Sequence, residues 1–206
     1  MNIIFKTVFI ILIASIHVSA QDHCLPSQWF VGLDIGGGGV YWNLDDPSEP
    51  GSFNGAGGIF NIRTSINYKM NRFSIGLGGK YDKIYVGELH NTINHDIVKK
   101  FDRGYIAQTK FFFIVEYDLF KRKNWSIGSA ISAGLAHTKA GLDGSLSKNN
   151  PYFGISTYLK WNDHHKLTYS IRPYAEIQSI KNHTTSLQQH TVVDFGCAIG
   201  LQFVVF

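Results

Sequence analysis

The stretch VDFGCAIGLQFVV, residues 193–205, decides the fold class of this chain. Its odd-numbered positions, from Val193 to Val205, are all apolar, whereas positions 194–202 of the even series are small or polar. A period of two places successive side chains on opposite faces of a β-strand. The stretch therefore predicts a strand with one wholly apolar face and a second face that carries Asp194 and Gln202.

The same alternation returns in seven further segments. Within residues 29–42, for example, Leu33 and Ile35 alternate with Asp34 and Gly36. The seven segments are residues 29–42, 54–70, 73–82, 104–119, 125–138, 152–161 and 167–180. Helical periodicity is scarce. The pattern therefore predicts an all-β chain of eight antiparallel strands.

The connections between these segments alternate in length, which indicates how the strands are arranged. Three are short (residues 70–72, 120–124 and 162–166) and four are long (43–53, 83–103, 139–150 and 181–191). This alternation is typical of an up-and-down transmembrane barrel with both termini in the periplasm. Most of the segments are long enough to cross a bilayer as tilted strands, and a sheet in lipid must close on itself to pair its backbone groups.

Residues 1–20 have the features of a secretory signal peptide. Lys6 supplies a positive charge, Thr7–Ile16 form a short apolar run, and Val18-Ser19-Ala20 offer small residues for cleavage before Gln21. We therefore expect residues 21–206 to form the mature barrel domain. The net charge of +4 is too small to indicate a nucleic-acid partner.

Two kinds of residue fit a narrow membrane barrel. Glycines at the lumen parity suit the crowded interior of eight strands, and Gly36–Gly39 are expected to give strand curvature or a bulge. Aromatic residues near strand ends are expected in the girdles at the membrane surfaces. These aromatic residues are Trp29, Tyr41, Phe73, Tyr105, Tyr117, Trp125 and Trp161.

At this point the chain resembles the small eight-stranded outer-membrane barrels, the OmpA-like and opacity-type surface proteins. The most specific part of the resemblance is the last segment, residues 200–206, because such barrels end in a strand that closes with an aromatic residue. Phe203 and Phe206 are the candidates for this assembly signal, although Phe206 has the parity opposite to Phe203. The resemblance implies the outer membrane of a Gram-negative bacterium, with the assembly machinery, outer-membrane lipids and lipopolysaccharide as partners.

Eight charged residues have the parity of the lumen, four of each sign. They are Asp34, Arg63, Lys80, Lys110, Glu116, Arg172, Glu176 and Asp194. Buried charges must be paired, so we expect a salt-bridged plug. A gated narrow pore is the alternative, and a catalytic group is a third interpretation.

Neither enzyme chemistry nor a metal site is indicated by a motif. Outer-membrane lipid A deacylases carry a His-x-Ser pair on the outer face of their barrel, but His137 is followed by Lys139 where the nucleophile would stand. The histidines of the long connections (His90, His95, His183 and His190) lack metal-binding spacing. We expect no catalytic, cofactor-binding or metal residues.

Three functions remain open at this stage. The first is a structural or surface-interaction barrel that presents four extracellular loops to a host or the environment. The second is a narrow, porin-like channel for ions or small solutes, and the third is a lipid-modifying enzyme. The missing nucleophile counts against the third and the narrow, charged lumen counts against the second, whereas the first rests on analogy alone.

Overall fold

The computed structural model describes residues 27–45, 52–91, 97–100, 105–140, 149–162, 167–181 and 189–205. Their strands are β1 (Gln28–Asp45), β2 (Ser52–Met70), β3 (Phe73–Asn91), β4 (Ile97–Lys100), β5 (Tyr105–Lys121), β6 (Trp125–Ala140), β7 (Asn150–Asn162), β8 (Leu167–Lys181) and β9 (Gln189–Val204). None of the described residues belongs to a helix that could cross a bilayer. The expected signal peptide and Phe206 lie outside the described residues.

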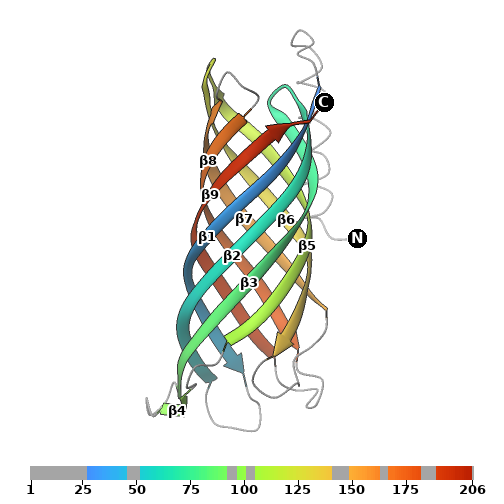
Figure 1. Ribbon diagram of the computed structural model, residues 1–206. Coiled ribbons are helices and arrows are strands. Elements are labelled where there is room, and N and C mark those ends of the chain that lie inside the picture. Colours follow the sequence, from blue (N-terminus) through green and yellow to red (C-terminus); the bar gives the residue numbers. More distant parts are fainter. Residues whose placement is uncertain are drawn as a thin grey trace.

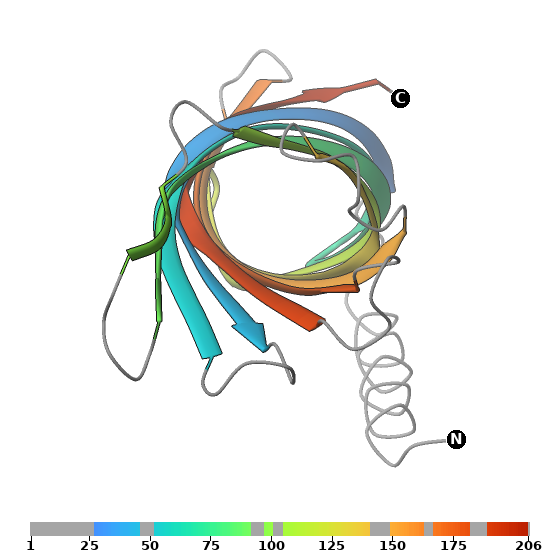
Figure 2. The ribbon, with the colours of Figure 1, turned by 90° about the horizontal axis from the view of Figure 1, so that it is seen from below.

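Eight of these strands form a closed antiparallel barrel. The sheet runs β2-β1-β9-β8-β7-β6-β5-β3, and β2 also pairs with β3, which closes the ring. Figure 1 shows the strands tilted relative to the barrel axis, and Figure 2 shows the closed ring from one end. The predicted eight-stranded up-and-down barrel is therefore confirmed.

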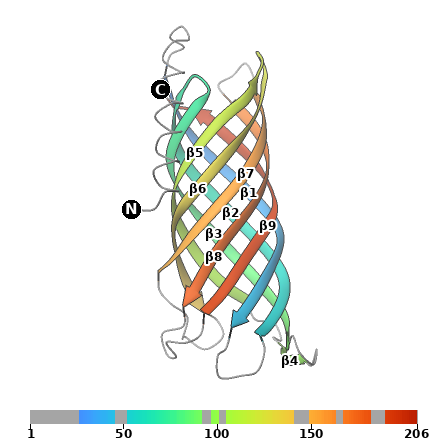
Figure 3. The ribbon, with the colours of Figure 1, turned by 180° about the vertical axis from the view of Figure 1, so that it is seen from behind.

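The two ends of the barrel differ as the connection lengths predicted. The last residues of β2, β5 and β7 lie at the same end of the barrel as the last residues of β9, whereas the last residues of β1, β3, β6 and β8 lie at the opposite end (Figures 1 and 3). The turn after β2 is tight, and Asn71 in it has a φ of 53°, a left-handed conformation that asparagine tolerates better than most residues. We call these two ends the short-turn end and the long-connection end.

Strand β3 is longer than the sequence predicted. Residues 83–91 were expected in a loop, but they continue β3, and Ile84 is fully buried inside the barrel. Strand β4 also pairs with residues 88–90 of β3. The prediction stopped at Asp82 because the apolar alternation weakens there, although ladder hydrogen bonds to β2 and β5 continue.

The four consecutive glycines of β1 do not form a bulge. Residues 36–39 pair without a register shift with both β2 and β9. A Cβ atom at Gly38 would overlap the carbonyl oxygen of Phe195 on the neighbouring strand. Glycine at this position therefore allows β1 and β9 to approach closely, whereas a larger residue would clash with the backbone of β9.

Apolar side chains cover the outside of the barrel. Leu77, Phe111 and Ile199 are 66–69% exposed, and many other large apolar residues on the same parity are also exposed. Such a contiguous apolar surface is stable only in contact with lipid. Together with the fold, this exterior bears out the expected location in the outer membrane of a Gram-negative cell.

One of the expected girdle aromatics does not lie on this exposed surface. Phe73 is only 4% exposed. It is the first residue of β3, directly after the tight turn at Asn71 and Arg72, and its cross-strand partners are Met70 and Tyr117. By contrast, Trp29, Tyr41, Tyr117 and Trp161 are exposed and Trp125 is half-buried, while the side chain of Tyr105 lies outside the described set.

Candidate functional site in the barrel lumen

All eight charged residues that the sequence assigned to the lumen point into it and are buried. The most exposed of them are Arg63 and Glu176, both at 7%, and Lys110 is fully buried. The strand register explains this burial, because the charged residues alternate with lipid-facing apolar residues on the same strands. The structure divides them into two clusters.

The first cluster is centred on Lys110 and also contains Lys80, Asp82, Glu176 and Asp194; we call it the Lys110 cluster. The Lys110 Nζ atom lies 2.6 Å from Glu176, 2.7 Å from Asp82 and 3.1 Å from Asp194. The Lys80 Nζ atom lies 2.9 Å from Glu176 and 3.2 Å from Asp82. Because the lysines stand on β3 and β5 and two of the acids on β8 and β9, the contacts of Glu176 and Asp194 cross the lumen.

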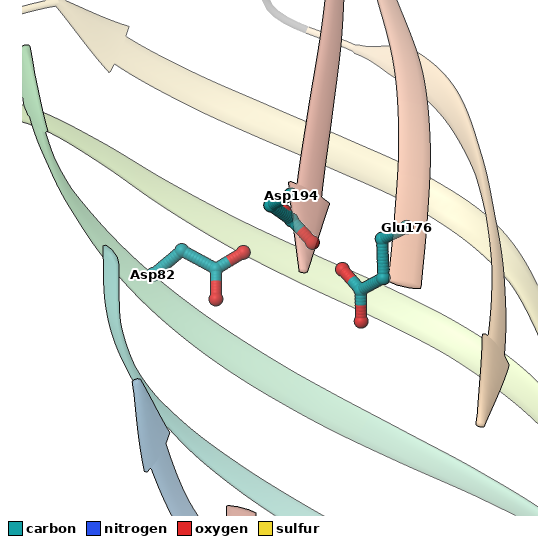
Figure 4. A group of neighbouring side chains, drawn as sticks. All are labelled: Asp82, Glu176 and Asp194. Atoms are coloured by element: carbon teal, nitrogen blue, oxygen red, sulfur yellow. The ribbon is translucent and has the colours of Figure 1, made fainter. Parts of the chain in front are cut away.

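Figure 4 shows the three carboxyl groups of this cluster, which point toward one another. Their oxygen atoms lie within 4.8 Å of one another, an arrangement that could hold a metal ion. However, the Lys110 ammonium is within 3.1 Å of all three carboxyl groups. The positive charge that a metal would supply is thus provided by a lysine, and the geometry fits an ion-pair cluster.

The second cluster is centred on Arg172 and also contains Asp34, Arg63, Glu116 and Lys160; we call it the Arg172 cluster. Glu116 accepts hydrogen bonds of 2.6 Å from both Arg172 and Lys160. Asp34 lies farther away, 3.8 Å from both the Arg63 and the Arg172 Nε atoms. The Arg172 guanidinium therefore joins β8 to β5 across the lumen, and Asp34 sits between the two arginines.

A third contact lies nearer the short-turn end. Asp118 accepts a hydrogen bond from Lys69 at 2.7 Å and another from the Tyr158 hydroxyl at 2.7 Å. The Tyr158 ring also lies under the ammonium of Lys160, 4.2 Å from its centroid, a distance suited to a cation–π contact. Tyr158 therefore connects this pair to the Arg172 cluster.

The charges balance over the whole network but not within each cluster. The Lys110 cluster has three acids and two bases, and the Arg172 cluster has three bases and two acids. The clusters are adjacent, since Arg63 of one is paired in the ladder with Lys80 of the other. Each cluster therefore partly neutralises the other, which reduces the cost of burying them.

The sequence reasoning missed four members of this network. They are Lys69, Asp82, Asp118 and Lys160. All four have the lumen parity in their strands, so alternation was the signal that could have found them. Each lies near the end of a predicted strand, where parity alone does not tell a lumen residue from a turn residue.

Beyond the charged clusters, the lumen is filled toward the long-connection end. An amide layer follows first, in which Gln178 donates to Gln108 at 2.9 Å and Gln108 donates to Thr138 at 3.3 Å. An apolar layer follows, which comprises Val40, Trp42, Ile59, Ile84, Ile106 and Val192, each at most 6% exposed. Interior apolar packing at this level excludes water from the barrel axis.

The other residues singled out in the sequence lie outside the lumen. Phe203 is exposed on the exterior at the end of β9, where its role as an assembly signal stays a prediction. His137 is half-buried on the exterior face of β6. Neither residue contributes to the charged network.

This chain is similar to several solved structures of outer-membrane proteins. Neisserial surface protein A (NspA) matches at a TM-score of 0.52 and 14% identity, over 88% of this chain and 100% of that chain. The outer membrane protease OmpT from Escherichia coli matches at 0.45 and 6%, over 89% of this chain and 99% of that one. The outer membrane protein OprG from Pseudomonas aeruginosa matches at 0.45 and 9%, over 84% of this chain and 95% of that one.

At 14% identity the likeness to NspA extends to the fold alone, and it confirms the predicted resemblance to small outer-membrane barrels. No known sequence family matches the chain. No curated protein matches it either. The lumen geometry therefore carries the functional argument.

Proposed function

We propose that this chain is a closed outer-membrane barrel that acts through the connections at its long-connection end and does not conduct solutes. The observation that carries the proposal is the set of ion pairs across the lumen. Lys110 reaches Glu176 and Asp194 from the opposite wall, and Arg172 reaches Glu116. Opening the lumen would separate these charges in a low-dielectric interior, which costs several kcal/mol.

Because the lumen is proposed to be closed, we propose that the connections at the long-connection end are the part of the protein that binds other molecules. A rigid barrel with a filled interior leaves its loops as the part that can meet other molecules, and binding residues often lie on loops held by a rigid scaffold. NspA, which shares the fold, is named a surface protein. In the proposed orientation the long-connection end faces the outside of the cell, where a host or environmental ligand would bind.

The remaining partners are those expected of any such barrel. Outer-membrane lipids and lipopolysaccharide would surround the apolar exterior, and the assembly machinery would read the last strand at Phe203. We propose no catalytic role, because the ionisable groups of the lumen are paired with one another and are buried away from substrate.

A narrow ion path is the second candidate, and one observation favours it. Buried polar atoms of the Arg172 cluster, among them Asp34 Oδ1 and the Nε atoms of Arg63 and Arg172, have no hydrogen-bond partner among the described residues. Buried polar groups of this kind are commonly satisfied by water. Water here would give ions a partial path, although the apolar layer would still close the long-connection end.

Single-channel recording separates the two candidates. Protein refolded and inserted into planar bilayers should give at most small, infrequent conductance steps. Steady large-conductance openings of the unmodified protein would refute the closed barrel and favour the channel. In parallel, a deletion strain with reduced binding to host cells but an intact envelope would support the surface role, and unchanged binding would count against it.

A further inference from the structure

Two turns at the short-turn end lie side by side and bring basic residues together. The turn between β2 and β3 contains Asn71 and Arg72, and the turn between β5 and β6 contains Arg122 and Lys123. The backbone N–H of Asp118 donates to the Arg72 carbonyl at 2.8 Å. Lys121 donates from its Nζ atom to the Asn71 carbonyl at 3.3 Å. The two turns therefore form one surface.

This surface carries an excess of positive charge, and we call it the basic rim. Arg72, Arg122 and Lys123 are exposed, and Lys121 is half-buried. Asp118, which precedes Lys121 on β5, is buried and already paired with Lys69 at 2.7 Å. The exposed cations of the rim consequently have no acid of their own within the described part of the chain.

Apolar side chains stand directly beside the basic rim because β5 has a bulge there. The register between β5 and β6 shifts between Asp118 and Phe120, so one extra residue is inserted into β5 and the alternation is broken. Leu119 and Phe120 therefore both face outward, at 56% and 62% exposed. The bulge presents two adjacent apolar side chains next to the cations.

An aromatic residue completes the boundary between these two kinds of surface. The Arg122 guanidinium lies 5.7 Å from the centroid of the Trp125 ring, and Trp125 begins β6 on the outer face. Tryptophan is enriched where a membrane protein meets the headgroups. A tryptophan between exposed cations and exposed apolar side chains is the arrangement typical of the boundary between headgroups and acyl chains.

We propose that the basic rim is a binding site for an anionic phospholipid in the leaflet at the short-turn end. The phosphate would be bound by the guanidinium and ammonium groups of Arg72, Arg122 and Lys123, since such groups donate charge-assisted hydrogen bonds to phosphate. The acyl chains would lie on Leu119 and Phe120. A soluble anion would leave Leu119 and Phe120 uncovered, whereas a lipid would cover them with its acyl chains. A lipid therefore fits this surface best.

The test compares lipid preference in bilayers. Refolded protein is placed in phosphatidylcholine bilayers that contain brominated phosphatidylglycerol, whose bromines quench nearby tryptophan fluorescence. Trp29, Trp125 and Trp161 all lie on the exterior near the short-turn end, so quenching reports lipid in that leaflet. The measured quantity is the binding constant for phosphatidylglycerol relative to that for phosphatidylcholine, obtained from the quenching by each lipid when it is brominated and mixed into phosphatidylcholine bilayers.

The decisive variant is R122Q/K123Q, and its matched control is K99Q/K100Q on β4 at the opposite end. Both variants remove two positive charges. Each cation near an anionic lipid surface contributes a modest attraction, so R122Q/K123Q should lower the preference for phosphatidylglycerol by roughly 10- to 30-fold. The control should keep the preference of the unmodified protein.

Two results would overturn the proposal. One is equal quenching by the two brominated lipids with the unmodified protein, and the other is an equal loss of preference in both double variants. Heat-modifiable gel mobility shows that each variant is folded. If R122Q/K123Q does not fold, the single variant R72Q replaces it, with an expected loss of roughly fivefold, and an unchanged preference in R72Q would refute the site.

Discussion

Replacing Lys110 with methionine tests whether the ion pairs of the lumen hold the barrel together. Methionine keeps the length and most of the volume of lysine but removes the charge. The variant K110M leaves Asp82, Glu176 and Asp194 buried around an uncharged side chain, with Lys80 as their remaining cation. Because the carboxyl oxygens lie within 4.8 Å of one another, their mutual repulsion is no longer offset by Lys110.

The expected magnitude follows from the three contacts of 2.6, 2.7 and 3.1 Å. At an effective dielectric constant of about 20, each contact has a gross Coulomb attraction of about 6 kcal/mol. The cost of removing the Lys110 ammonium from water and the repulsion among the three acids offset most of the combined attraction of the three contacts. Removing one partner of a buried pair costs about 3–5 kcal/mol, which is the loss of unfolding free energy that we expect for K110M.

The assay is reversible urea unfolding in lipid vesicles, followed by tryptophan fluorescence. The matched control is K123M, which removes an exposed ammonium and should leave stability unchanged in vesicles of phosphatidylcholine alone, because these contain no anionic lipid for the basic rim. A loss below about 1 kcal/mol at neutral pH would refute the reasoning.

Three further predictions address other parts of the barrel. The variant R172A should lower the free energy of unfolding by about 3 kcal/mol in the same assay, because Glu116 loses its 2.6 Å partner across the lumen. It should also raise the frequency of conductance steps in planar bilayers. A stability equal to that of the unmodified protein would contradict the network. Cys197 is exposed on the lipid-facing side, so a charged maleimide should label it slowly in bilayers and quickly in urea, and fast labelling in bilayers would mean that this face meets water. The variant G38A should lose about 1–3 kcal/mol or fail to fold because its Cβ overlaps a neighbouring strand, whereas G58A, whose Cβ would have 3.9 Å to the nearest atom, should be tolerated; equal stability of the two variants would refute the close approach.

The strand count and the two faces of each strand could be predicted from the sequence because both depend on local periodicity. Leu33, Asp34 and Ile35 show this plainly, since each lies on the face that its parity predicted. The alternation of short and long connections likewise predicted which ends of the strands lie together. These features need no knowledge of where distant strands meet.

The sequence failed where local periodicity gives no signal. The extension of β3 depends on pairing with β5 as far as Tyr85 and with β2 as far as Asn91, rather than on apolar alternation. The bulge that turns both Leu119 and Phe120 outward depends on the β5–β6 register. The burial of Phe73 is likewise not indicated by its parity, which is that of the exposed face.

The charged residues show most clearly which features the sequence determined and which ones depended on the tertiary structure. Parity determined that Lys110 and Glu176 face the lumen, because successive side chains of a strand point to opposite sides. Only the tertiary structure decided that they meet at 2.6 Å, because the stagger of the closed barrel sets the heights of β5 and β8 relative to each other. That stagger is a property of the whole ring of strands, and no single segment of the chain encodes it.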